Sequence, residues 1–206
     1  MLNDLKKFIE LLERFQSVER TVSVRGSKPI RWENDIEHSY ILAMCAWYLN
    51  DKAQIGLNTD KLLRYALVHD LVEAYAGDVS PFGLKGHKGK YVEDKTKREQ
   101  KALRRIQSEF PEMVEMYSLI HAYEERKDAE SRFIYSLDKL LAPLEIYMDD
   151  GRAFHHYQLV LKELVEKKRG KIDQHDLVSE LWQELVEEME EQEGLFPELS
   201  NEKTHS

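Results

Sequence analysis

Apolar residues recur three and four positions apart along nearly the whole chain, which is the period of an amphipathic α-helix. In the first segment the apolar stripe consists of Leu2, Leu5, Phe8, Ile9, Leu12 and Phe15. The same period predicts further helices that begin near Asn34 and Asn58 and helices over about 91–110, 112–125, 129–148, 153–168 and 173–193. The helix from Asn58 should end at Gly77. Because Thr21–Val24 is the best strand candidate and is too short to build a sheet around, we expect an all-α helical bundle.

The chain has 206 residues, no internal repeat and no linker-like segment. At about 100–200 residues per domain, this length predicts one helical domain. We place it over residues 1–194, with a core over about 5–150 and C-terminal helices over 153–193. Residues 195–206 lack periodicity and should form a flexible tail, and the glycine- and lysine-rich stretch 82–90 should be a surface loop.

Acidic residues outnumber basic ones by 39 to 30, which gives a net charge of −9. This balance argues against a nucleic-acid partner, although a small anionic ligand can still bind where the local charge is positive. Residues 85–105 hold nine lysines or arginines and three acids, so one segment is locally basic. The longest apolar run, residues 41–49, is too short for a membrane span. The single cysteine, Cys45, and the charged start predict a cytoplasmic protein without disulfides or a cysteine-based zinc cluster.

Three polar residues lie where their helices should be apolar. His38 and Asp138 are three or four positions from apolar neighbours, and His69 extends the stripe of its helix, with Asp70 next to it. Each has an ordinary explanation taken alone, such as a hydrogen-bonded core histidine or an ion pair between Asp138 and Lys139. Together, two imidazoles and two carboxylates from three helices suit a divalent ion such as Mn, Fe, Co, Ni or Zn in a bundle core.

Two further acids extend this group. Glu73 stands four residues after His69, on the same helical face, where it could take a proton from a metal-bound water. Alternatively, it is a solvated acid or a partner for Arg64. Asp78 follows Gly77 and could hold a water or the substrate, or simply cap a turn.

These residues and their surroundings resemble the HD-domain metal-dependent phosphohydrolases, in particular the 5′-deoxynucleotidase-like branch. The resemblance rests on Glu33-Asn-Asp-Ile-Glu-His38-Ser39, on the segment His69–Asp78, which is similar to an HDxxExxxGD motif, and on 123–140. It implies one divalent metal (Mn, Co, Zn, Ni, Fe or Mg) bound by His38, His69, Asp70 and Asp138, with Glu73 and Asp78 assisting a nucleophilic water. It also implies hydrolysis of (deoxy)ribonucleoside 5′-monophosphates to nucleoside and phosphate, and a homodimer.

The sequence departs from that branch upstream of His38. The branch has an Arg-Trp pair there that helps to hold the nucleotide, whereas this chain reads Glu19-Arg20-Thr21. We expect Arg20 and Arg25 to take part of that role. The developing charge on a phosphoryl group needs cations, and we expect Lys85 and Lys95 to supply them from the basic segment.

Three alternatives remain open at this stage. The chain could be another HD-domain phosphohydrolase, acting on nucleoside triphosphates, cyclic nucleotides or alarmones, which needs more basic residues for the additional phosphates. It could be a di-iron oxygenase, for which His121 is a weak candidate ligand. It could also be a non-enzymatic metal-binding regulator.

Overall fold

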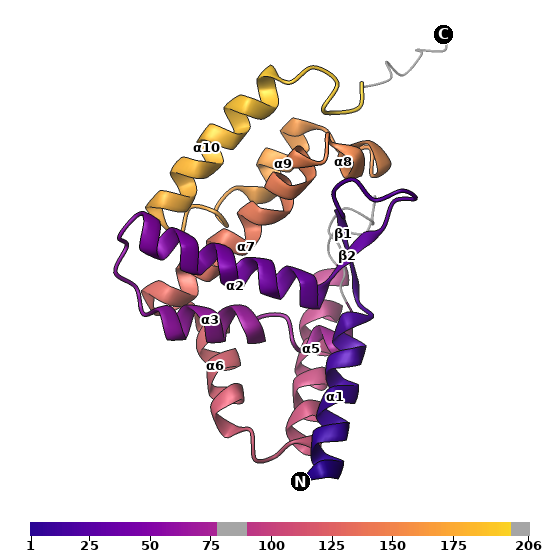
Figure 1. Cartoon of the computed structure of the whole chain (residues 1–206), viewed down its shortest axis with the longest axis vertical. Helices are drawn as coiled ribbons and strands as arrows, with labels where there is room; N and C mark the ends of the chain where they lie inside the picture. Colours follow the sequence, from indigo (N-terminus) through magenta and orange to yellow (C-terminus); the bar gives the residue numbers. More distant parts are fainter. Residues whose placement is uncertain (78–89, 199–206) are drawn as a thin grey trace.

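The computed structural model describes residues 1–77 and 90–198, and its architecture is helical as predicted (Figure 1). The helices are α1 (Leu2–Gln16), α2 (Asp35–Lys52), α3 (Thr59–Val68), α4 (Glu73–Ala76), α5 (Lys90–Glu109), α6 (Val114–Glu125), α7 (Ala129–Met148), α8 (Arg152–His156), α9 (Leu161–Lys168) and α10 (Asp176–Glu191). Two strands, β1 (Glu19–Ser23) and β2 (Trp32–Asn34), complete the fold. In the described ranges no helix combines the length and the apolar character that a bilayer crossing needs.

Polar side chains fix the starts of the helices that carry the polar residues singled out above. Asn34 Oδ1 accepts hydrogen bonds from the backbone N–H groups of Ile36 and Glu37, both at 3.1 Å. Asp128 caps α7 through the N–H of Ser131 at 2.7 Å, and Asn58 caps α3. Such caps satisfy N–H groups that have no partner inside the helix. The predicted starts at Asn34 and Asn58 are therefore confirmed.

The expectation that the chain forms no sheet is wrong for the segment before α2. Strands β1 and β2 pair antiparallel, with Glu19 opposite Asn34 and Ser23 opposite Trp32. The sheet is small, since β2 has only three residues. The pairing brings β1 next to Asn34, at the start of α2, and α7 contacts β1.

The single helix expected from Asn58 to Gly77 is interrupted after Val68. The N–H of Leu71 bonds to the carbonyl of Val68, and the N–H of Glu73 bonds to that of Asp70. These i→i−3 bonds tighten the chain relative to an α-helix, which changes the directions of His69 and Asp70. Helix α4 then ends at Gly77 as predicted, and the positive φ of Gly77, 71°, is a conformation that glycine adopts without strain.

The helix expected over residues 153–168 is likewise divided into α8 and α9. Gln158, between them, has a φ of 51°, a left-handed conformation that no α-helix can continue through. The chain therefore changes direction before α9 begins.

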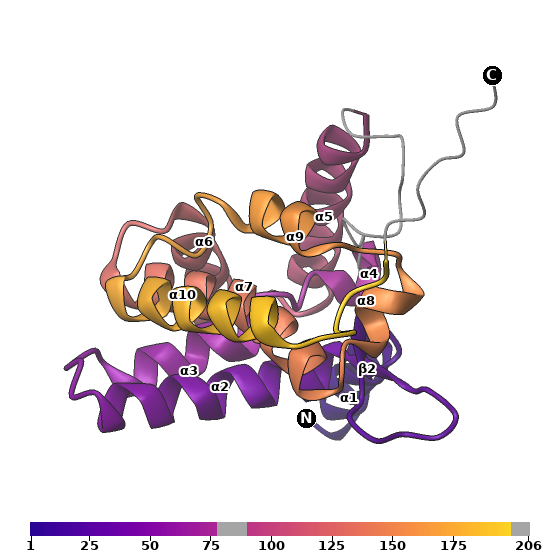
Figure 2. The same ribbon diagram turned by 90° about the horizontal axis from the view of Figure 1, so that it is seen from above.

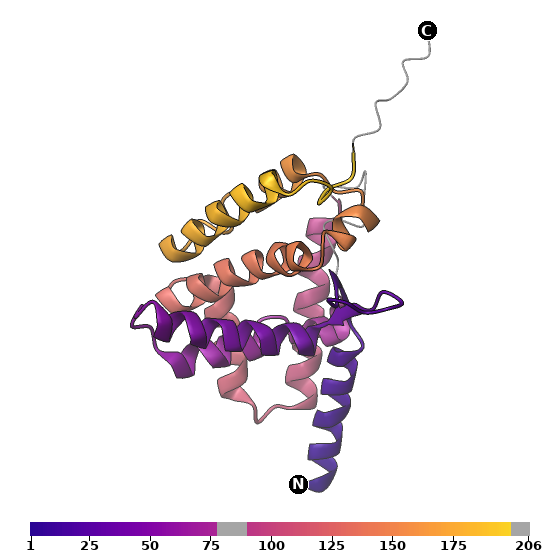
Figure 3. The same cartoon turned by 45° about the horizontal axis from the view of Figure 1, so that its top comes forward.

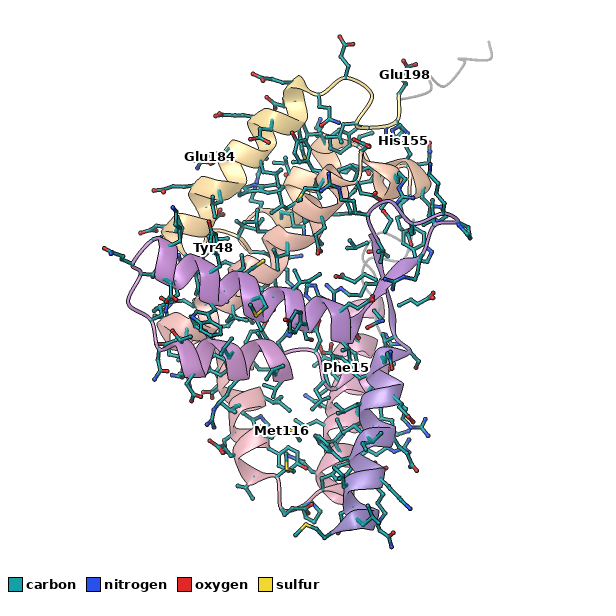
Figure 4. The ribbon with its side chains drawn as sticks, viewed as in Figure 1. Phe15, Tyr48, Met116, His155, Glu184 and Glu198 are labelled. Atoms are coloured by element: carbon teal, nitrogen blue, oxygen red, sulfur yellow. The ribbon has the colours of Figure 1, made fainter. Side chains whose placement is uncertain are left out.

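The helices form layers around two apolar clusters. Helix α7 contacts α2 and α3 on one side and α10 on the other, as Figures 2 and 3 show. One cluster fills these layers around Leu42, Leu62 and Phe133. The other joins α1, α5 and α6, where Phe15 and Met116 point inward, while Glu184 lies on the outer side of α10 (Figure 4). Because Tyr65 belongs to the first cluster and Val72 to the second, the turn at His69–Val72 lies where the two clusters meet.

Candidate metal site

Three of the four expected metal ligands converge in the interior. His38 comes from α2, His69 follows α3 directly and Asp138 comes from α7. One ligand atom from each lies within 4.8 Å of the other two. The three residues are 0%, 3% and 3% exposed. Buried imidazoles and carboxylates gathered so closely are typical of a metal centre built from inward-facing helix residues.

The environment of His69 fits a cation at this point. Its Nδ1 lies 2.9 Å from the carbonyl oxygen of Ala66, which can only accept, so Nδ1 carries the proton. Nε2 then faces the carboxylate oxygen Oδ2 of Asp70 at 3.0 Å and forms no hydrogen bond with a described residue. Two lone pairs at this distance need a positive charge between them, either a proton on Nε2 or a metal ion.

His38 is held as a neutral ligand. Burial and the charge of Arg20 lower the pKa of His38 to about 4, against the opposing effect of Asp138. His38 Nε2 lies 3.1 Å from Asp138 Oδ1. A neutral imidazole is the form that binds metals, so His38 is ready to act as a ligand at neutral pH.

Asp70, the fourth expected ligand, adjoins the other three and begins a second group. Its carboxylate lies with those of Asp35 and Glu73, within 4.8 Å of one another. Burial alone would raise the pKa of Asp70, but His69 and Arg20 lower it below its usual range. Asp70 is therefore ionised, as a metal ligand must be.

Arg20 of β1 reaches into the middle of these acids. Its guanidinium lies 3.1 Å from Asp70, 3.3 Å from Asp35, 3.5 Å from Glu33 and 3.8 Å from Asp138. Burial would lower the pKa of Arg20, yet the carboxylates of Asp70, Asp138 and Asp35 raise it above the ordinary value. Arg20 is thus a permanent positive charge beside the candidate ligands. The structure therefore supports the expectation that Arg20 lies near the site. The β1–β2 sheet, which the sequence did not predict, positions Arg20 there.

Glu73, the predicted general base, is paired with a lysine and not with the arginine considered as its alternative partner. Glu73 is buried, and its partner is Lys95 at 3.5 Å, whereas Arg64, the alternative partner, pairs with Asp60 and Glu115.

Lys95 therefore lies beside the acids of the site, and it also pairs with Glu99 at 3.4 Å. Arg25 is exposed in the connection between β1 and β2, and no ion pair joins it to the site in the part of the chain that the structure describes. Asp78 and Lys85 lie outside the described residues.

Several charged residues near the site were not expected. Glu33 and Glu145 lie next to His38, with one ligand atom of each of the three residues within 4.8 Å of the others. Glu33 Oε2 is 3.7 Å from His38 Nδ1. Burial, together with the charge of Glu145, raises the pKa of Glu33 to about 8, so Glu33 keeps a proton at neutral pH. Lys139, expected only as an alternative partner of Asp138, does contact it, with Nζ 2.5 Å from Oδ2. Lys168 at the end of α9 is also buried.

No single sequence signal identifies these additional residues. Asp35 and Glu33 follow the pattern of a helix start, where acids are ordinarily exposed, and both are buried here. Lys168 stands among other charged residues in a segment that matches no motif. The burial of all three comes from tertiary contacts between distant segments.

The comparisons with known proteins agree with this geometry. A model of the HD domain family matches residues 12–182, which is most of the chain. The chain therefore belongs to the HD-domain family. Its all-α fold agrees with that of a solved structure from Magnetospirillum magnetotacticum, described as a predicted metal-dependent phosphohydrolase, with a TM-score of 0.75, 25% identity and coverage of 95% of this chain and 98% of the other.

Curated relatives indicate which branch of the family this chain resembles. The human protein named 5′-deoxynucleotidase HDDC2 is 29% identical over 188 residues, which span 90% of this chain and 84% of that protein. The bovine protein of the same name is 32% identical over 140 residues, 66% of this chain and 63% of its own length. The predicted resemblance to this branch of the family is confirmed.

Proposed function

We propose that this protein is a metal-dependent phosphohydrolase that converts (deoxy)ribonucleoside 5′-monophosphates into nucleoside and phosphate. The observation that carries the proposal is the buried convergence of His38, His69 and Asp138, with Asp70 adjoining. The names of the curated relatives support the nucleotide as substrate. The residues present fit a divalent ion, because a bare imidazole nitrogen and a carboxylate oxygen face each other there.

The proposed ligands are His38, His69, Asp70 and Asp138. A divalent ion bound by them would lower the pKa of a bound water from about 15.7 toward about 7 and withdraw charge from a phosphoryl oxygen. The proposed ion is one of Mn, Co, Zn, Ni, Fe and Mg, all of which accept nitrogen and oxygen ligands to different degrees.

The protein's own residues supply the proton transfer and part of the charge. Glu73 is buried beside Asp70 and, as the proposed general base, takes a proton from the attacking water on a carboxylate oxygen. The water oxygen forms the new bond to phosphorus and the bond from phosphorus to the nucleoside O5′ breaks, while the proton that Glu73 has taken passes to the departing O5′, so that the nucleoside leaves as a neutral alcohol. The guanidinium of Arg20 and the ammonium of Lys95 lie next to the acids of the site, where they oppose the negative charge of the transferred group. Arg25, Lys85 and Asp78 remain part of the proposal as further contacts to substrate or water.

We also propose a homodimer. Four large side chains are exposed on α2 at successive spacings of four, three and one: Tyr40, Met44, Trp47 and Tyr48. This spacing places them along one face of the helix. A contiguous exposed apolar face of this kind is typical of a protein–protein contact, and a second copy of the chain is the partner proposed here.

The test is a screen of the purified full chain against deoxyribo- and ribonucleoside 5′-monophosphates, with each metal added in turn. We expect orthophosphate release with at least one metal and one deoxynucleotide. Metal content, measured by mass spectrometry, should be one ion per chain. It should fall in Asp138→Asn and His69→Ala but remain unchanged in His121→Ala, which alters an exposed histidine of α6.

Other outcomes would contradict the proposal in distinct ways. Absence of turnover with every monophosphate and every metal would refute the activity. Release of pyrophosphate from triphosphates would identify another HD-domain chemistry. Two irons per chain would favour an oxygenase, and full biological function of the His69→Ala variant would favour a regulator.

A further inference from the structure

Glu33, the middle residue of β2, is a buried acid that takes no part in the proposed reaction. It is 3% exposed and stands directly before Asn34, which caps α2. It is also the first residue of the segment Glu33–Ser39 on which the family resemblance partly rests. Because a carboxyl group removed from water costs free energy unless hydrogen bonds compensate for it, the burial of Glu33 calls for a physical reason.

Three buried polar atoms meet at this side chain. Glu33 Oε2 lies 3.5 Å from Arg20 Nε and 3.7 Å from His38 Nδ1. In the part of the chain that the structure describes, none of these three atoms has a hydrogen-bond partner. Arg20 Nε carries a hydrogen at every ordinary pH and can only donate it. An unused donor and an unused acceptor therefore lie beside each other, slightly beyond the ordinary hydrogen-bond distance.

The two nitrogens of His38 lie on different sides of this arrangement. His38 Nε2 is 3.1 Å from Asp138 Oδ1, so an ion held together with Asp138 would bind Nε2. A neutral imidazole then carries its single proton on Nδ1. Metal-binding histidines ordinarily donate this proton to a carboxylate, a carbonyl or a water, which fixes the orientation of the ring. Glu33 Oε2, at 3.7 Å from Nδ1, is in the place of that carboxylate.

One oxygen of Glu33 can serve both donors. Ionised or protonated, a carboxyl group keeps an oxygen that accepts two hydrogen bonds, so this role does not depend on the charge of Glu33. Polar contacts in ligand-free sites are often long and shorten when the ligand binds. Glu145 of α7 adjoins the group, with a ligand atom within 4.8 Å of those of Glu33 and His38, and its buried Oε2 has no hydrogen-bond partner among the described residues.

We propose that Glu33 is a positioning residue that accepts hydrogen bonds from His38 Nδ1 and Arg20 Nε. It thereby couples the orientation of a proposed metal ligand to that of a proposed substrate contact. The small sheet makes this possible, since β1 supplies Arg20 and β2 supplies Glu33. The part that concerns Arg20 rests on the phosphohydrolase function above, whereas the part that concerns His38 can be tested by metal binding without turnover.

The first experiment titrates manganese into the metal-free full chain by calorimetry. Glu33→Met keeps a long side chain and removes the acceptor, whereas Glu33→Gln keeps a carbonyl oxygen and can turn its NH2 group toward Glu145. We expect Glu33→Met to weaken manganese binding about 10- to 100-fold, as the loss of such a histidine partner implies. Glu33→Gln should recover most of the affinity. The matched control, Glu19→Met, alters an exposed acid of the same sheet and should leave the affinity unchanged.

The second experiment separates the two donors by steady-state kinetics with deoxyadenosine 5′-monophosphate at saturating manganese. Glu33→Met should raise KM, because Arg20 loses the acceptor that orients it. In an Arg20→Met background, Glu33→Met should leave KM unchanged but should still weaken manganese binding, since His38 loses its acceptor in either background. A general loss of packing would instead change both quantities in both backgrounds.

A measurement on the unmodified chain covers the case in which Glu33→Met fails to fold. With zinc as a diamagnetic ion, the Nδ1–H proton of His38 should give a downfield, slowly exchanging signal in nuclear magnetic resonance spectra. The same signal should persist in Glu33→Gln, which keeps the acceptor.

Several results would overturn the proposal. They are unchanged manganese affinity in Glu33→Met, equal losses in Glu33→Gln and Glu33→Met, absence of the His38 signal from the zinc-loaded chain, and an unmodified chain that binds neither metal. A second manganese ion per chain that is lost in Glu145→Gln would also overturn it, because Glu33, His38 and Glu145 would then hold a metal themselves.

The manganese titration also distinguishes this proposal from the proposed activity. Manganese binding that depends on Glu33, in a chain without turnover, would refute the activity and support the role of Glu33 toward His38. Turnover in a chain whose manganese affinity is unchanged by Glu33→Met would do the reverse.

Discussion

Replacement of Lys168 by methionine should stabilise the ligand-free protein, which is an unusual expectation for a buried position. Methionine keeps a long, flexible stem and removes the ammonium, so the packing around the end of α9 changes little. The ammonium is unfavourable here because burial and the nearby charges of Lys139, Lys171 and Arg20 lower the pKa of Lys168 from 10.5 to about 7.

The size and pH dependence of the effect follow from this pKa difference. At about 1.4 kcal/mol per pH unit, the difference between 10.5 and about 7 corresponds to about 5 kcal/mol of lost stability when both states are protonated. The unfolded chain keeps the proton up to pH 10.5, whereas the folded protein releases it above pH 7, so this penalty shrinks as the pH rises between these values. We expect Lys168→Met to gain about 5 kcal/mol from charge removal at pH 6 and about 2 kcal/mol at pH 9.

The assay is urea unfolding of the full chain at pH 6, 7.5 and 9, with a chelator present and Lys162→Met as the control. Any change in packing contributes equally at each pH, so the decrease of about 3 kcal/mol between pH 6 and pH 9 isolates the charge. The control should show no such trend. A free-energy difference between Lys168→Met and the unmodified chain that is independent of pH, or that grows toward pH 9, would refute the reasoning.

Two further predictions concern the proposed reaction and assembly. Glu73→Gln should lower kcat about 10²- to 10⁴-fold without changing the metal content, as the loss of a general base implies. The control, Glu99→Gln, alters the other partner of Lys95 and should keep near-normal kcat. Equal losses of kcat in both variants would argue against a general base at Glu73. Trp47→Glu should convert a dimer into a monomer in size-exclusion chromatography with light scattering. The control, Val114→Glu on α6, also alters an exposed apolar position and should leave the dimer intact. A monomeric unmodified chain would refute the proposed dimer contact on α2.

The helical architecture was predictable because each long helix carries its own apolar period. Helices α1, α5, α6 and α7 follow from local spacing, and Asn34 and Asn58 mark the starts of α2 and α3 through hydrogen bonds formed within three residues. The interruption after Val68 was not predictable in this way, since residues 69–76 continue to suit a helix. Tight i→i−3 bonds there depend on the positions that His69 and Asp70 take in the site.

The convergence of His38, His69 and Asp138 could be expected because histidine and aspartate on apolar helix faces conflict with the pattern around them. Asp70 and Glu73 follow from the motif that they share with His69. Glu33, Asp35 and Lys168 show no such conflict, because charged residues at helix ends are ordinarily solvated. For Glu33 and Asp35, burial results from the approach of β1, α2 and α7, which come from distant parts of the chain.

The acidic balance of the whole chain does not by itself set the electrostatic potential at the candidate metal site. The net charge of −9 is spread over exposed residues such as Glu184 on the outer side of α10 (Figure 4). At 0.1 M salt, exposed charges more than about 10 Å away are largely screened. Buried charges such as Arg20 and the carboxylates of Asp35 and Asp70 beside it are screened much less, so they set the potential at the site despite their small number. The affinity of the site for an anionic substrate should therefore depend on these few enclosed charges and only weakly on the overall charge of the protein.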